Sequence, residues 1–201
     1  MKQFVKNYFF QNRIEYLKVF MVFIIGIVIS IMIVNQSNND QKKEIKDYID
    51  NKIELVKVNN YENKMEVFKN SLLRNLKNYI LIVLLASSII GLPIVYFIVI
   101  KKAFSIGYTA ASIFATQNTR TAIIFICNSI LFHNIIYLAS IFIVLVSGVL
   151  FTKAFFERRN LKFEVFRYMF FALIGLILII VSSLCEAYIS INFLYLLKKY
   201  I

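Results

Sequence analysis

The sequence predicts an all-α, polytopic integral membrane protein with about five transmembrane helices, a short re-entrant or interfacial segment and an extracytoplasmic helical segment. Hydrophobic residues make up 60% of the chain and charged residues 17%, with a mean hydropathy of +0.71. Soluble domains are about half apolar and a quarter charged. The apolar residues also gather into long uncharged runs, and a helix needs about 20 such residues to cross a bilayer.

The first uncharged run follows a basic N-terminal segment. Residues 1–18 are predicted to form an amphipathic cytoplasmic segment, and 19–38 the first transmembrane helix. This run ends on Asn35 and Gln36 with no small-residue cleavage site, so we interpret it as an uncleaved signal anchor rather than a secretory signal.

Residues 40–78 form a polar segment between the first two runs. Apolar residues recur in it at helical spacing on both sides of Asn59 and Asn60. The segment is therefore predicted to be an extracytoplasmic helical hairpin or helix pair, whose second helix runs into the membrane. Its mixed charge is most simply a solvated helix face, and the alternative is a docking surface for a partner.

The second run, 79–100, contains Pro93, the only proline of the chain, two residues after Gly91. Proline lacks an N–H, and its ring clashes with the carbonyl four residues earlier. We therefore expect one transmembrane helix at 79–100 that bends just before Pro93. Lys101 and Lys102 follow this run and are expected to lie at its end.

The third transmembrane helix is expected at 103–119. Small residues recur in it at every fourth position, a stripe that lets helices approach closely in lipid. The stripe consists of Ala103, Gly107, Ala111 and Ala115, and a similar step occurs at Gly26 and Ser30 of the first run. Helix packing is the favoured interpretation, and a water-lined path along nearby serines and threonines is the alternative.

The fourth run is too long for one simple span. The 32 residues from Thr121 to Thr152 would reach about 48 Å as a straight helix, against a hydrocarbon core of about 30 Å. We expect a break near His133-Asn134, with 121–132 re-entrant or interfacial and 134–152 as the fourth transmembrane helix. If 121–132 crosses instead, the C-terminus changes sides.

The chain then continues into a cytoplasmic basic loop at 153–167 and a fifth transmembrane helix at 168–189. Basic residues next to helix ends favour a cytoplasmic N-terminus. Two ionisable residues, His133 and Glu186, fall at the predicted break and near the end of the last helix. Because charges are costly in lipid, Glu186 is either a helix-end carboxylate facing water or a buried polar partner, and both readings stay open.

Catalytic motifs are lacking. The sequence has one histidine and contains no H-E-x-x-H, G-x-S-x-G or G-x-x-x-x-G-K-S/T pattern. We therefore expect a protein that is not an enzyme and that uses no metal or cofactor. The net charge of +12 is explained by basic residues that flank the membrane spans, so no nucleic-acid partner is expected.

Several short stretches, taken together in order and spacing, resemble the stage II sporulation protein M family. They are F-K-N-S-L-L-R-N-L-K at 68–77, S-I-I-G-L-P-I at 88–94, Lys101, Gly107, N-I-I at 134–136 and L-C-E-A-Y-I-S at 184–190. The resemblance covers most of the chain and matches its length and layout of spans.

The resemblance implies a non-catalytic membrane scaffold in the mother cell of an endospore-forming bacterium. Such a scaffold helps to localise two peptidoglycan-degrading partners, sporulation proteins D and P, to the septum during engulfment. Homo-oligomerisation stays open. The residues expected to serve structure or partner contacts are Phe68, Ser71 and Asn75 at the outer mouth of the second span, Gly91 and Pro93 within it, and Gly107, Asn134 and Glu186.

A small transporter or channel subunit is the alternative function. Its polar path would run near Gly91, Pro93, His133, Asn134 and Glu186, because interrupted helices at mid-membrane often mark such sites. Against this alternative, the sequence shows no inverted repeat, and few charges are expected at membrane depth.

Overall fold

The computed structural model describes residues 2–38, 43–44, 47, 64–116, 118–158 and 160–190. Throughout these ranges the regular secondary structure is helical, as the sequence predicts. The first helix expected within the polar segment 40–78 lies almost entirely outside the described residues. The helices are α1 (Lys2–Gln11), α2 (Arg13–Gln36), α4 (Lys64–Ala86), α5 (Gly91–Thr116), α6 (Thr119–Phe125), the π-helix η1 (Ile126–Leu131), α7 (Phe132–Phe156), α8 (Leu161–Leu184) and the π-helix η2 (Cys185–Ser190).

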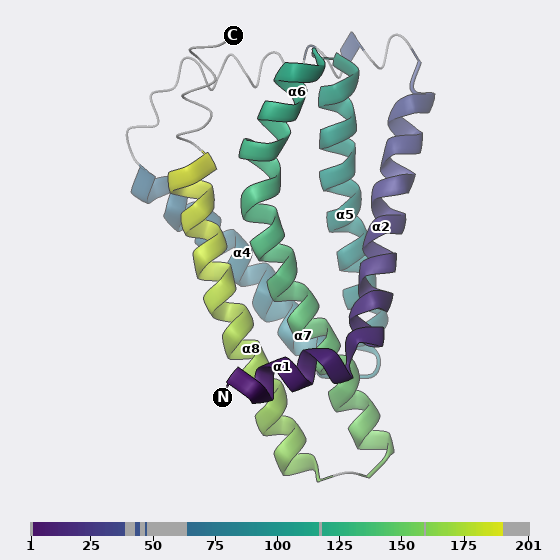
Figure 1. The fold of residues 1–201 in the computed structure, drawn as a ribbon, viewed down its shortest axis with the longest axis vertical. Coiled ribbons are helices and arrows are strands. Elements are labelled where there is room, and N and C mark those ends of the chain that lie inside the picture. The colour runs from purple at the N-terminus through teal and green to yellow at the C-terminus, as the bar shows by residue number, and fades with distance from the viewer. Residues whose placement is uncertain are drawn as a thin grey trace.

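Four of these helices are long and apolar enough to cross a membrane: α2, α5, α7, and α8 continued through η2 to Ile189. The protein is therefore an α-helical polytopic membrane protein. α4 has similar length, but Lys69, Arg74 and Lys77 lie in its last 18 residues and make it too polar to meet the same criterion. α4 nevertheless packs beside α7 and α8 within the bundle (Figure 1).

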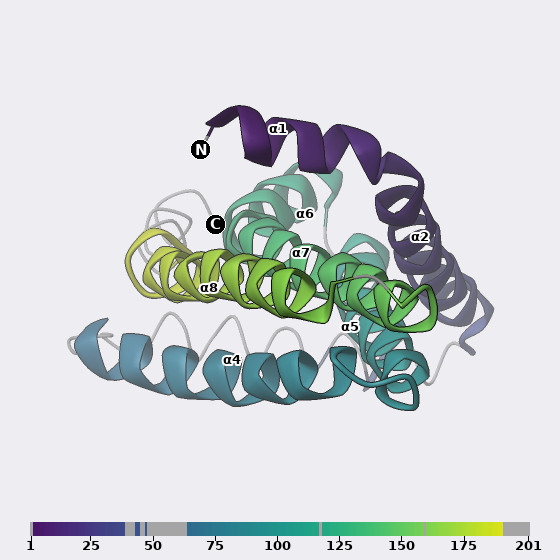
Figure 2. The ribbon, with the colours of Figure 1, turned by 90° about the horizontal axis from the view of Figure 1, so that it is seen from below.

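The N-terminal helix α1 lies across one end of the bundle (Figure 1, Figure 2). The ring of Tyr8 stacks on that of Phe171 of α8, with centroids 3.8 Å apart. The guanidinium carbon of Arg167 lies 5.8 Å from the Tyr8 ring centroid. Burial raises the pKa of the Tyr8 hydroxyl, because the phenolate would lose its hydration. Aromatic packing therefore ties the basic N-terminal segment to the start of α8.

The prediction of a single helix at 79–100 is wrong, because α4 ends at Ala86 and α5 begins at Gly91. The two helices form an antiparallel hairpin joined by residues 87–90. As a result, the bounds expected for the third span, 103–119, are also wrong. Lys101 and Lys102 lie inside α5 rather than at a helix end.

Local hydrogen bonds explain the reversal at residues 87–90. The hydroxyls of Ser87 and Ser88 donate to the carbonyls of Leu84 and Leu85 in the last turn of α4. Ser88 Oγ in turn accepts a 3.0 Å bond from the N–H of Gly91. A Cβ at Gly91 would overlap the Leu85 carbonyl, so the turn requires glycine there. Pro93 falls in the first turn of α5, where its missing N–H does not break the helix.

The expected break near His133-Asn134 is also absent. Residues Thr119–Phe156 form one helical run, in which η1 separates α6 from α7 (Figure 1). A π-helical turn takes in an extra residue without ending the helix. The helical run Thr119–Phe156 is longer than a membrane span, and its C-terminal part in α7 extends past α1 (Figure 1). The loop expected at 153–167 is correspondingly shorter, because α7 continues to Phe156 and α8 begins at Leu161.

Small residues set the contact between α2 and α5. A Cβ placed on Gly26 would lie 2.7 Å from the Cβ of Ala103, and one placed on Gly107 would overlap the hydroxyl of Ser30. The first half of the small-residue stripe therefore faces its counterpart on α2. Its last member, Ala115, is exposed.

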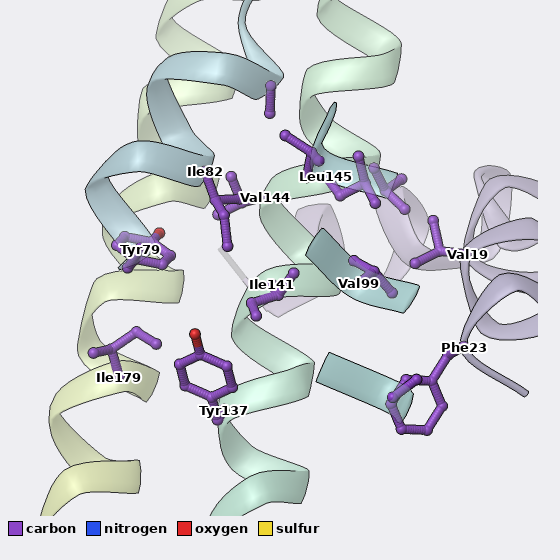
Figure 3. Packing of buried hydrophobic residues seen from close by; sticks show 14 of the residues in the cluster. Val19, Phe23, Tyr79, Ile82, Val99, Tyr137, Ile141, Val144, Leu145 and Ile179 are labelled. Atoms are coloured by element: carbon purple, nitrogen blue, oxygen red, sulfur yellow. The ribbon is translucent and has the colours of Figure 1, made fainter. Parts of the chain in front are cut away.

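An apolar core fills the middle of the bundle (Figure 3). All five long helices contribute side chains to this core, and their packing fixes the positions of the helices relative to one another. Its labelled members are Val19 and Phe23 from α2, Tyr79 and Ile82 from α4, Val99 from α5, Tyr137, Ile141, Val144 and Leu145 from α7, and Ile179 from α8.

Candidate functional site

A cluster of polar side chains centres on Glu186 in η2. Its Oε2 accepts a 2.5 Å hydrogen bond from Ser71 Oγ, and its Oε1 lies 2.7 Å from Arg74 Nη2. Both donors lie on α4, whereas η2 continues α8. The carboxylate therefore joins two antiparallel helices through one neutral and one charged donor.

Asn75 extends the cluster one turn further along α4. Its Nδ2 lies 3.2 Å from Ser71 Oγ and 3.1 Å from Ser183 Oγ on α8. Ser71, Asn75 and Ser183 are all buried. Since buried polar groups are costly unless they are hydrogen-bonded, these contacts stabilise the α4–α8 pairing.

His133 and Asn134 lie at the start of α7, on a third side of the cluster. The hydroxyl of Ser182 donates a 2.8 Å bond to the His133 carbonyl, and Asn134 Nδ2 lies 3.1 Å from His133 Nε2. The imidazole lies within electrostatic range of Glu186. The cluster thus draws side chains from α4, α7 and α8.

The contacts of α2 show where Lys102 of α5 lies along the bundle. Glu15 pairs with Lys153 at 2.6 Å near one end of α2, and the uncharged run extends from Val19 to beyond Gln36 at the other. Gly26 lies three residues before the midpoint of that run, about 5 Å along the helix, and touches Ala103, the neighbour of Lys102. Lys102 therefore lies level with the central part of the uncharged run of α2.

A cavity of about 370 Å³ adjoins Lys102. The ammonium nitrogen of Lys102 lies 4.9 Å from the centroid of the Tyr137 ring, a cation–π contact. We call this cavity the basic groove; its lining residues are Asn78 and Leu81 from α4, Ile98, Lys101, Lys102 and Ser105 from α5, and Tyr137 and Ile141 from α7.

A comparison with protein-family models finds one that covers most of the chain, including the residues of this cluster. The model described as Stage II sporulation protein M matches residues 19–191 of the 201. The chain belongs to the stage II sporulation protein M family. Neither curated proteins nor solved structures give a match. In this stage II sporulation protein M family member, the match takes in the whole polar cluster and leaves α1 outside.

The residues expected to matter in this family member fall into separate places. Ser71, Asn75 and Glu186 form one hydrogen-bonded unit, and Asn134 adjoins it through His133. Phe68 is half-buried on α4, three residues before Ser71.

Three further predicted residues lie away from the polar cluster. Gly91 and Pro93 lie at the α4–α5 hairpin, and Gly107 packs against α2. The polar path of the alternative function is therefore assembled only around His133, Asn134 and Glu186.

Sequence reasoning missed Arg74 and Lys102 as parts of the site. Arg74 lies within the quoted F-K-N-S-L-L-R-N-L-K stretch, one residue before Asn75, so helical spacing from Ser71 was the available signal. Lys102 gives no such signal, because the uncharged run 79–100 before it has the length of a complete span.

The polar cluster of this stage II sporulation protein M family member is held together by hydrogen bonds and an ion pair. The described residues contain no group of three or more His, Cys, Asp or Glu side chains placed to hold a metal ion. Cys127 and Cys185 are free thiols, the first exposed and the second half-buried.

Proposed function

We propose that this protein is a non-catalytic membrane scaffold that helps to localise peptidoglycan-degrading partners during endospore engulfment. The observation that carries the proposal is the family match over residues 19–191. Together with the four apolar helices, this match identifies the chain as a sporulation-related membrane protein. We propose in addition that it acts as a scaffold and that its partners are sporulation proteins D and P. We place it in the mother-cell membrane at the septum.

The architecture supports a scaffold in physical terms. A wall hydrolase must be held at one place on the membrane, and a bundle with several apolar helices is firmly anchored in lipid. α2 ends and α4 begins at the end of the bundle opposite α1 (Figure 1). With a cytoplasmic N-terminus, as we propose, that opposite end faces the wall.

Imaging of a partner tests the proposal. Fluorescently tagged protein D or P is followed in sporulating cells with and without this chain, beside a tagged membrane protein unrelated to sporulation as control. We expect the septal signal of the partner to disperse when the chain is absent and to return when it is restored. A septal signal that persists without the chain would remove the scaffold role.

A transporter or channel subunit is the second candidate, and one observation favours it. The basic groove places Lys102 beside a cavity level with the central part of the uncharged run of α2. Solute or ion flux into vesicles that contain the purified chain, abolished by Lys102→Gln, would favour transport over the scaffold.

A further inference from the structure

The basic groove lies between two helices that separate along their length. α4 and α5 meet at residues 87–90 and diverge toward the other end of the bundle (Figure 1, Figure 2). The groove opens between them with α7 as its floor. Asn78 on α4 and Lys101 and Ser105 on α5 are exposed at its rim.

Within the described part of the chain, the two lysines of this groove, Lys101 and Lys102, form no ion pair with a carboxylate, and Glu186 acts on Lys102 only from a distance. Glu186, the acidic residue of the neighbouring cluster, is already held by Arg74 and Ser71. Two lysines thus line the cavity, and the described carboxylate that acts on Lys102, Glu186, is paired with Arg74 instead.

Such a surface is costly against lipid. A lysine near the centre of a bilayer costs several kcal/mol, and polar side chains at this depth normally face protein or a polar cavity. The hydroxyl of Ser105 at the rim adds a polar group that hydrocarbon cannot hydrogen-bond. A partner that covers the groove and supplies negative charge would relieve both costs.

We propose that the basic groove binds a membrane-spanning helix of another protein that carries an acidic side chain, with the carboxylate placed against Lys102. Depth argues for a helix, because Lys102 is level with Gly26, whereas lipid phosphates lie about 15 Å from the bilayer centre. Charge argues for a different protein, because in a second copy of this chain Glu186 is already paired with Arg74. The inference goes beyond the scaffold proposal and does not depend on it.

A synthetic helix tests the proposal on the intact chain. The labelled protein is reconstituted in phosphatidylcholine vesicles with a Leu/Ala-rich transmembrane peptide that carries one central Glu, or with a matched peptide that carries Gln. Energy transfer reports association. We expect the Glu peptide to bind about tenfold more tightly, in line with polar contacts worth 1–2 kcal/mol in lipid. Lys102→Arg should keep this preference and Lys102→Gln should remove it.

Matched variants keep the test decisive. Lys162→Gln removes an exposed lysine at the start of α8 and should leave the preference unchanged. If Lys102→Gln fails to fold, Ser105→Leu narrows the rim without removing charge and should weaken binding of the Glu peptide.

Three results would overturn the inference. The first is equal binding of the Glu and Gln peptides by the unmodified chain. The second is binding that follows anionic phosphatidylglycerol instead of the peptide, which would make the groove a lipid site. The third is energy transfer between two copies of the chain that Lys102→Gln abolishes, which would make the groove a self-association surface.

Discussion

Glu186 holds the ends of two helices together with very few atoms. Ser71 and Arg74 reach it from α4, and its side chain is 22% exposed, so little water competes for its oxygens. Hydrogen bonds to charged groups contribute about 1.5–3 kcal/mol each, more than neutral ones. Glu186 therefore has a structural role even before any partner is considered.

Replacing Glu186 by Gln should lower the stability of the protein. The amide keeps an acceptor for Ser71 but loses the charge that pairs with Arg74, so we expect the free energy of unfolding to fall by about 2 kcal/mol. Denaturant unfolding in detergent measures the change. Glu66→Gln, at an exposed position in the first turn of α4, is the control and should stay within about 0.5 kcal/mol. Equal stability of the two variants would contradict this role.

The same substitution also bears on the proposed function in cells. A pure anchor fails only by losing its partners. If the hydrolases still reach the septum with Glu186→Gln while engulfment stops, the protein does more than anchor them.

Among the elements, the α4–α5 hairpin shows where sequence reasoning succeeds and fails. Composition and the length of the uncharged runs predicted the all-helical membrane class, because that class depends on hydropathy summed over about 20 residues. The helix bounds depended on an uncharged run, and a run does not distinguish one bent helix from two helices and a turn. Here Ser87, Ser88 and Gly91 decide in favour of the turn through hydrogen bonds and close contact.

The candidate site shows a similar division. Family-like stretches identified Ser71, Asn75 and Glu186, although 115 positions separate Glu186 from Ser71. Their meeting depends on the antiparallel pairing of α4 with α8, which local spacing does not encode. The depth of Lys102 could not be found either, since it depends on the contact of Ala103 with Gly26.

The α2–α5 interface gives a prediction at the scale of elements. Gly107→Val should separate these helices, because even a Cβ at this position meets Ser30 and comes within 3.1 Å of the Ile27 Cα. We expect a loss of roughly 2 kcal/mol in the free energy of unfolding. Ala115→Val, at an exposed position of the same stripe, is the control. A loss of equal size in both variants would show that β-branching, not close packing, is responsible.

At the scale of the whole molecule, the contacts fix which parts of the chain share a depth. α2 and α5 run in the same direction, and Gly26 touches Ala103. Arg13 precedes Gly26 by 13 residues and Ile90 precedes Ala103 by 13, so the hairpin lies level with the start of α2. The hairpin therefore reaches the membrane surface near α1, although its sequence reads as the middle of a span.

Thiol labelling tests this arrangement. In a chain that carries Cys127→Ser and Cys185→Ala, we expect Ile90→Cys to react with a membrane-impermeant maleimide, because Ile90 is 83% exposed at the hairpin. It should react from the same side as Lys162→Cys at the start of α8, a comparison made with right-side-out and inverted vesicles. Leu84→Cys, exposed on α4 but deeper, should stay unlabelled until detergent is added. If Ile90→Cys is equally protected, residues 79–100 cross as one helix and the hairpin is wrong.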